Sequence, residues 1–102
     1  MRDPGVIADL IISRFITNNG AKGKRNYFGC LGKTSEGVLV SRQNGSSYDV
    51  SKDYIIQAIE AVRKELSIYE DGPARLKPYI NRWIYSPLWA LLHLLSMDEI
   101  ME

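Results

Sequence analysis

Residues 37–66 read GVLVSRQNGSSYDVSKDYIIQAIEAVRKEL, and this stretch decides the fold class. Its Val38-Leu39-Val40 run is rich in β-forming residues and predicts a strand over about 37–42. Asn44-Gly45 is typical of a tight turn and leads into a short third strand near Ser47–Val50. Strands that follow one another through short turns pair as an antiparallel sheet.

The second half of the same stretch predicts an amphipathic helix. Ser51 can accept a backbone N–H as the N-cap, and Asp53 in the first turn suits the helix dipole. Asp71-Gly72-Pro73 is expected to end this helical segment. The apolar side chains of the predicted stripe recur at helical spacing: Ile55, Ile56, Ile59, Val62 and Leu66.

Upstream of this stretch, the chain predicts a helix over about 4–17 and a strand over about 26–31. Asp3 is positioned as the N-cap of the helix, with Pro4 at its first position, and Asn18-Asn19-Gly20 ends it. Residues 19–25 are too polar and glycine-rich for regular structure and are expected to form a loop. Gly32–Gly37 is expected to connect the strand to its successor as a hairpin turn.

After the strands, the pattern predicts two to four helices, of which the helix that begins at Ser51 is the first. One is expected to begin near residue 77 or 78, at Pro78, and to carry Trp83 and Ile84. Ser86-Pro87 supplies the N-cap and first-turn proline of a helix that runs to Leu95. Ser96-Met-Asp-Glu99 matches a capping box and predicts a last helical turn.

This element order predicts an α+β fold: an N-terminal helix, a small antiparallel sheet of two to three strands, then a C-terminal group of helices. With 102 residues, 45% of them apolar and 25% charged, the chain is expected to form one globular domain over 1–102. Cys30 is the only cysteine, so no intramolecular disulfide can form, and a reducing compartment is expected. Neither a signal-peptide pattern nor a membrane span is found, which predicts a cytoplasmic protein that does not enter a membrane.

No motif predicts an enzyme. Gly32-Lys33-Thr34 ends like a phosphate-binding P-loop, but Tyr27 stands where the first glycine is required, and the segment leads into a strand instead of a helix. Cys30 and His93 are each the only residue of their type and stand among apolar neighbours, which favours structural roles. One cysteine and one histidine also make a poor metal site, so no cofactor and no metal are expected.

The glycine-rich segment 20–27 is the best candidate for ligand binding. Its cations can follow a phosphate chain, its tyrosine can stack on a base, and two cations of the predicted hairpins could join them. The net charge of +1 argues neither for nor against nucleic acid, and a solubilising loop is the plainer interpretation. The candidate nucleic-acid-binding residues are Lys22, Lys24, Arg25, Tyr27, Lys33 and Arg42.

The C-terminal segment is unusually rich in apolar and aromatic residues. Seven of the eight residues of Leu88–Leu95 are apolar, and a helix that is apolar all round must be surrounded by its own domain or by a partner. Burial as the central helix of its own core is one interpretation. The other is that the thin core of a small domain leaves part of the helix uncovered, which favours a homodimer or an apolar ligand cavity. The candidate interface or cavity residues are Trp83, Tyr85, Leu88, Trp89, Leu92 and Leu95.

These patterns predict a non-enzymatic binding protein, a homodimer with nucleic acid as its ligand. The alternative is a protein that binds a small molecule in an aromatic cavity near the C-terminal helices.

Overall fold

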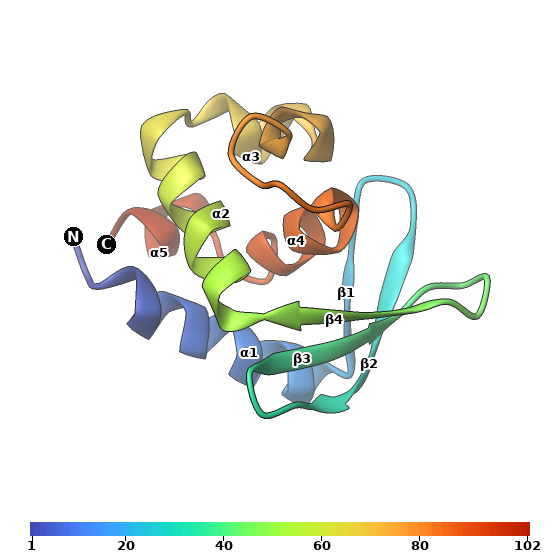
Figure 1. The fold of residues 1–102 in the computed structure, drawn as a ribbon. Helices are drawn as coiled ribbons and strands as arrows, with labels where there is room; N and C mark the ends of the chain where they lie inside the picture. Colours follow the sequence, from blue (N-terminus) through green and yellow to red (C-terminus); the bar gives the residue numbers. More distant parts are fainter.

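The first half of the chain forms a helix and a sheet, and the second half forms helices (Figure 1). A computed structural model describes all residues from Met1 to Glu102. The α+β class predicted from the sequence is confirmed. The elements are α1 (Pro4–Asn18), β1 (Gly20–Lys22), β2 (Tyr27–Lys33), β3 (Gly37–Ser41), β4 (Ser47–Ser51), α2 (Lys52–Lys64), α3 (Ser67–Asp71), the 3-10 turn η1 (Pro73–Leu76), α4 (Tyr85–Leu92) and α5 (Met97–Met101).

The sheet has four antiparallel strands in the order β1-β2-β3-β4, whereas two to three strands were predicted. The additional strand, β1, lies in the segment predicted to be a loop, where Gly20 pairs with Gly29 and Ala21 with Phe28. Local propensity does not predict it, because its stability comes from the ladder to β2 and from burial of Ala21. A bulge between Cys30 and Gly32 shifts the register of β2 against β3.

One face of the sheet is covered by helices and the other is open. Alternate residues point to opposite faces of a strand, so the buried positions define the inner face. The helices α1, α2 and α4 contact the sheet on this side, and the opposite face carries exposed residues such as Tyr27 and Asp49. The inner-face residues are Ala21, Phe28, Val38, Val40 and Val50.

The predicted ends of α1 are confirmed. The carboxylate of Asp3 accepts the Gly5 backbone N–H at 2.7 Å, and Pro4 occupies the first helical position. The helix stops at Asn19, which adopts the left-handed conformation with φ of 60°. Asn tolerates this conformation better than most residues, which is why the Asn-Gly pair ends the helix.

The helix α2 begins as predicted and ends earlier. The hydroxyl of Ser51 accepts the Tyr54 N–H at 3.4 Å. The helix stops at Lys64 because Glu65 takes up an extended conformation, and the short helix α3 follows. Leu66 was predicted to belong to the apolar stripe, but it lies beyond this break and is 52% exposed.

The predicted helix from residue 77 or 78 is absent. After η1 the chain makes a single turn in which the N–H groups of Tyr79 and Ile80 both donate to the Leu76 carbonyl. A helix would have placed Ile80, Trp83 and Ile84 on one side. Packing instead buries Ile80 and Ile84 and leaves Trp83 83% exposed.

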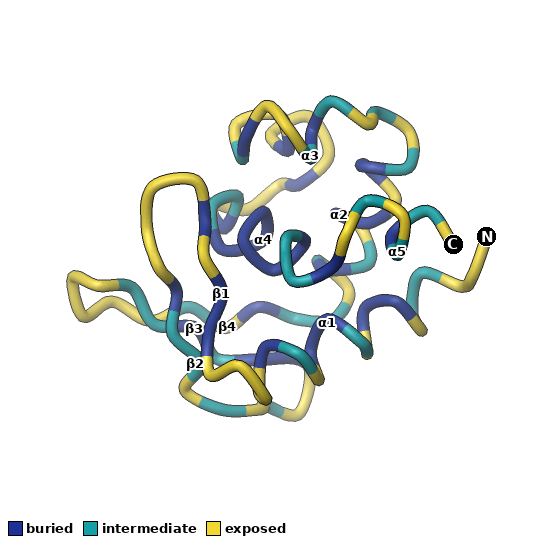
Figure 2. Tube along the Cα trace, turned by 180° about the vertical axis from the view of Figure 1, so that it is seen from behind, coloured by how far each residue is buried: buried dark blue, intermediate teal, exposed yellow.

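The helix α4 occupies the centre of the molecule. It contacts α1, α2, β1 and η1, and most of its residues are buried (Figure 2). It begins at Tyr85, with Ile84 as its N-cap, so Ser86 lies inside the first turn and does not cap the helix as predicted. No helix is both long enough and apolar enough to cross a membrane.

The short helix α5 is attached to the rest of the fold by an ion pair. Ser96 and Glu99 form the predicted capping box. The guanidinium of Arg14 binds the Glu99 carboxylate through two hydrogen bonds of 2.6 and 3.0 Å, and it also donates to the Leu94 carbonyl. The Arg14 hydrogen bond, followed by that from the Ser96 backbone, lowers the pKa of Glu99 to about 2.

Replacement of Leu91 by Ala should destabilise the fold strongly. Leu91 is fully buried on α4, so the substitution removes apolar contacts and leaves a cavity. We expect the free energy of unfolding, measured by urea denaturation, to fall by about 2–5 kcal/mol. Leu66→Ala is the control and should change it by less than about 0.5 kcal/mol, because Leu66 is exposed. Equal reductions in the two variants would contradict the central position of α4.

The Arg14–Glu99 pair should make stability depend on acid pH. The folded-state pKa of Glu99, about 2, lies below its ordinary value of 4.5. The ionised carboxylate therefore stabilises the fold above pH 4.5, and this contribution disappears as the pH falls through about 2. Melting temperatures measured across this interval should fall more steeply for the natural protein than for Glu99→Gln. Asp98→Asn is the control, since Asp98 makes no ion pair, and it should keep the steep dependence.

Candidate nucleic-acid interface

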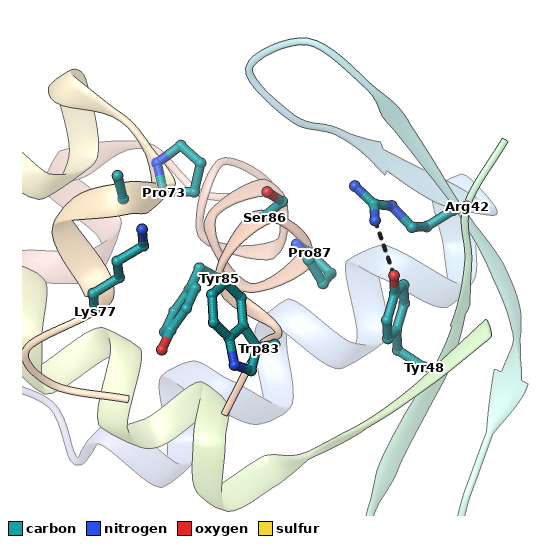
Figure 3. Close-up of a pocket in the computed structure, with 9 residues that line it drawn as sticks. Arg42, Tyr48, Pro73, Lys77, Trp83, Tyr85, Ser86 and Pro87 are labelled. Atoms are coloured by element: carbon teal, nitrogen blue, oxygen red, sulfur yellow. Dashed lines mark hydrogen bonds between the residues drawn. The ribbon is translucent and has the colours of Figure 1, made fainter. Parts of the chain in front are cut away.

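Three adjoining hollows form one groove at an end of the sheet, and Figure 3 shows the residues that line one of them. Its walls are the β1–β2 loop, the base of the β3–β4 hairpin and the segment 71–87. Two of the hollows, with volumes of about 300 and 280 Å³, share Pro73, Ala74 and Ser86. The third has a volume of about 280 Å³ and shares Arg42 with the first and Asn26 with the second. We call it the basic–aromatic groove, after the charged and aromatic side chains that line it: Lys24, Arg25, Arg42, Lys77, Tyr48, Trp83 and Tyr85.

The sheet wall presents a fixed guanidinium. Arg42 follows the last residue of β3, and one of its terminal nitrogens donates to the Tyr48 hydroxyl at 2.9 Å. The same guanidinium lies 5.7 Å from the centre of the Tyr48 ring and 5.9 Å from that of Phe28. A guanidinium carries five N–H donors, so this anchoring leaves several of them for an anion. Arg42 is thus oriented before any ligand binds.

The opposite wall carries aromatic rings. The ring centres of Trp83 and Tyr85 are 6.0 Å apart and their planes are tilted by 59°. The Lys77 ammonium lies 5.9 Å from the centre of the Trp83 indole, a distance at which cation and ring attract each other. Figure 3 shows Trp83 and Tyr85 facing Arg42 and Tyr48 across the groove.

The N-terminus of α4 lies between the two hollows that share Ser86. Ser86, in the first turn, lines both of them. The first N–H groups of a helix have no intrahelical acceptor, and no side chain caps them at this end of α4. The positive end of the helix dipole therefore adds to the charge of the surrounding cations.

The β1–β2 loop closes the groove by crossing Gly72. The Lys24 ammonium donates to the Asp71 carbonyl at 2.8 Å. Gly72 has φ of 124°, a conformation that L side chains rarely adopt, and a Cβ there would lie 3.0 Å from the Lys24 nitrogen. Glycine at this position therefore permits both the turn and the close approach of the loop.

The groove favours anions. Four cations line its three hollows, and Asp71 is the only carboxylate among their lining residues. The Asp71 carboxylate is already paired with Arg75 at 2.9 Å. A surface with a local excess of unpaired cations attracts anionic ligands even when the net charge of the protein is near zero.

The structure brings only some of the predicted basic residues together. Lys24, Arg25 and Arg42 line the groove. Lys22 and Tyr27 form a cross-strand pair on the open face of the sheet, and the Tyr27 hydroxyl donates to the Asn19 carbonyl at 3.3 Å.

Lys33 also lies apart from the groove. It stands at the far end of β2, about 20 Å along the strand from Tyr27, in a polar hollow with Asp9, Glu36 and Lys52. The turn that follows it is the predicted hairpin connection, in which the Thr34 hydroxyl accepts the Gly37 N–H at 3.0 Å.

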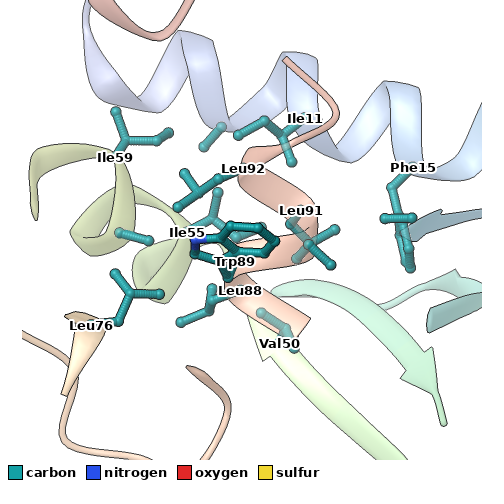
Figure 4. Packing of buried hydrophobic residues seen from close by; sticks show 14 of the residues in the cluster. Ile11, Phe15, Val50, Ile55, Ile59, Leu76, Leu88, Trp89, Leu91 and Leu92 are labelled. Carbon is teal, nitrogen blue, oxygen red and sulfur yellow. The ribbon is translucent and has the colours of Figure 1, made fainter. Parts of the chain in front are cut away.

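The predicted C-terminal residues divide between the groove and the core. Trp83 and Tyr85 line the groove. Leu88, Trp89, Leu92 and Leu95 are at most 7% exposed and pack among residues of α1, α2, β4 and η1 (Figure 4). The expectation that this helix keeps an uncovered side is therefore corrected: the chain surrounds it, so these four side chains have no surface to offer a second subunit.

His93 and Cys30 occupy structural positions. The His93 ring is sandwiched between Tyr69 and Trp89, with ring centres 3.9 and 3.8 Å away. Its Nδ1 lies 3.0 Å from the Trp89 carbonyl. Cys30 is half-buried on β2. No group of three or more metal-ligating side chains is present.

Two groove residues, Tyr48 and Lys77, were missed from the sequence. Tyr48 could have been found, because it is two residues before buried Val50 on the predicted strand and so shares its inner face. Lys77 carries no comparable signal, since it lies in a segment without regular structure and reaches the groove only through the packing of η1.

No protein-family model matches the chain, and neither a curated protein nor a solved structure is detectably similar to it.

The two tryptophans should report separately on groove and core. Trp83 is 83% exposed, whereas Trp89 is 7% exposed and donates to the Ile68 carbonyl at 2.8 Å. We expect Trp83→Phe to shift the fluorescence emission to shorter wavelength and to remove most quenching by acrylamide. Trp89→Phe should leave a red-shifted, readily quenched emission. If Trp83→Phe left quenching unchanged, the indole would not stand at the surface.

Proposed function

We propose that this protein binds nucleic acid along the basic–aromatic groove. The observation that carries the proposal is the convergence of four cations with an exposed indole and two tyrosines around one groove whose only carboxylate is already paired. Cations attract the phosphates, and exposed aromatic rings stack on bases. The sequence suggested the cations of the β1–β2 loop and Arg42 separately from Trp83 and Tyr85, and their shared location supports one function for both groups.

Dimerisation through α4 does not enter the proposal. Its basis was the uncovered side expected of that helix, and Leu88, Trp89, Leu92 and Leu95 are buried within the chain. The groove is formed by one chain alone.

A second candidate is a small anionic molecule with a planar ring. The hollow lined by Tyr48, Trp83 and Tyr85 has a volume of about 300 Å³, at the lower end of the range for small-molecule sites, ~300–1,000 Å³. A mononucleotide that binds as tightly as an oligonucleotide would favour this alternative, because a longer ligand would then gain nothing from the remaining cations.

Removal of the groove cations should weaken binding and flatten its salt dependence. We expect Lys24→Ala and Arg42→Ala each to reduce affinity for a fluorescently labelled oligonucleotide. Each should also reduce the slope of log K against log salt by about 0.7–0.9 for every phosphate that the variant no longer neutralises. Fluorescence anisotropy titrations at several salt concentrations measure both quantities.

Lys33→Ala is the matched control, because it also removes one positive charge, but at a position outside the groove. Its affinity and salt slope should equal those of the natural protein. Absence of binding below about 100 μM at low salt would refute the proposal, since even non-specific binders reach that range at physiological salt.

A further inference from the structure

The exposed indole of Trp83 is the groove feature that bears on which form of nucleic acid binds. It is the most exposed aromatic side chain, although the same chain buries Trp89 almost completely. The Lys77 ammonium and the Tyr85 ring centre lie 5.9 and 6.0 Å from the centre of the Trp83 ring, and neither covers the indole. An indole kept at the edge of a cationic groove offers a stacking face for one planar ligand.

Resting on the proposed function, we infer that the groove takes single-stranded nucleic acid in preference to duplex. One base stacks against Trp83, and the adjoining phosphates lie toward Arg42 and the Lys24–Arg25 loop. Base–aromatic stacking requires an unpaired base whose face is free, and in a duplex the neighbouring base pairs cover that face.

The distribution of charge on the surface supports this preference. The β3–β4 hairpin is the element that protrudes furthest from the body of the molecule (Figure 1), but residues 43–47, Gln-Asn-Gly-Ser-Ser, carry no charge. A hairpin that bound duplex phosphates would need cations near its tip. The cations instead surround hollows of about 300 and 280 Å³, which suit individual nucleotides of a strand and not the width of a double helix.

The cation expected to bind a phosphate and the ring expected to stack on a base also lie on opposite walls of one hollow. Arg42, held by the Tyr48 hydroxyl and by two aromatic rings, lies on one wall. Trp83 lies on the other wall of the same hollow (Figure 3). A nucleotide between them would place its base and its phosphate on opposite walls, an arrangement in which a flexible single strand can lie and a rigid duplex cannot.

The test compares a single-stranded oligonucleotide of about 8 residues, within the ~4–16 nucleotides that one small binding fold covers, with its blunt duplex at the same salt. We expect the single strand to bind at least about tenfold more tightly and to quench Trp83 emission. Trp83→Ala should weaken single-strand binding by about tenfold or more, Trp83→Phe should restore part of the affinity, and duplex binding should be unaffected.

Leu31→Ala is the control, because Leu31 is also a large exposed apolar residue, 57% exposed, on the β2 bulge outside the groove. Its affinity should equal that of the natural protein. Melting temperatures near that of the natural protein would show that the variants fold.

The outcomes separate this inference from the proposed function. Equal affinities for single strand and duplex, or binding unchanged in Trp83→Ala, would overturn the single-strand inference while the groove remained a nucleic-acid site. Polyphosphate that binds as tightly as the oligonucleotide would overturn it too, since charge alone would then suffice. If neither form of nucleic acid binds, the proposed function fails.

Discussion

Burial of an all-round apolar helix is the constraint on which the rest of the structure depends. A helix with apolar residues on every side can be stable in water only when other elements surround it. Here α1, α2, β1 and η1 do so, and the Trp89 indole, whose N–H is a polar group within the core, donates to the Ile68 carbonyl. The sheet supplies Val50 and Phe28 from its inner face to the same cluster. The arrangement of both halves of the chain therefore follows from covering α4.

The groove is a consequence of that arrangement. Because α4 is buried while its first turn reaches the surface, the segment that leads into it must cross the exterior beside the sheet. Buried Ile80 and Ile84 attach this segment to the core and turn Trp83 outward. The β1–β2 loop then reaches over Gly72 from the other side, where Lys24 binds the Asp71 carbonyl. The β1–β2 loop and the segment that leads into α4 thus place their side chains beside Tyr48 of β4 and Tyr85 of α4, around one groove.

The groove carries a local excess of positive charge, although the whole chain is nearly neutral. The chain has a net charge of only +1, yet the carboxylates near the groove are few, and Asp71 is neutralised by Arg75. Elsewhere ion pairs connect helices of the fold. Arg14 of α1 binds Glu99 of α5, and Lys52 of α2 binds Asp9 of α1. The cations of the groove form no such ion pairs, so no carboxylate of the protein neutralises them before an anionic ligand binds.

The sequence by itself determined the α+β class, both ends of α1, the start of α2, the hairpin turns and the capping box of α5. These features depend on contacts within a few residues, such as Asp3 with Gly5 or Ser96 with Glu99. Tertiary structure alone decided that Gly20–Lys22 pairs as a strand, that 77–84 is not a helix and that Leu88–Leu92 of α4 are buried on every side, since each depends on contacts that local sequence preferences do not contain. The same holds for the groove: Lys24, Arg42 and Trp83 have no relation in sequence, and only packing around α4 makes them neighbours.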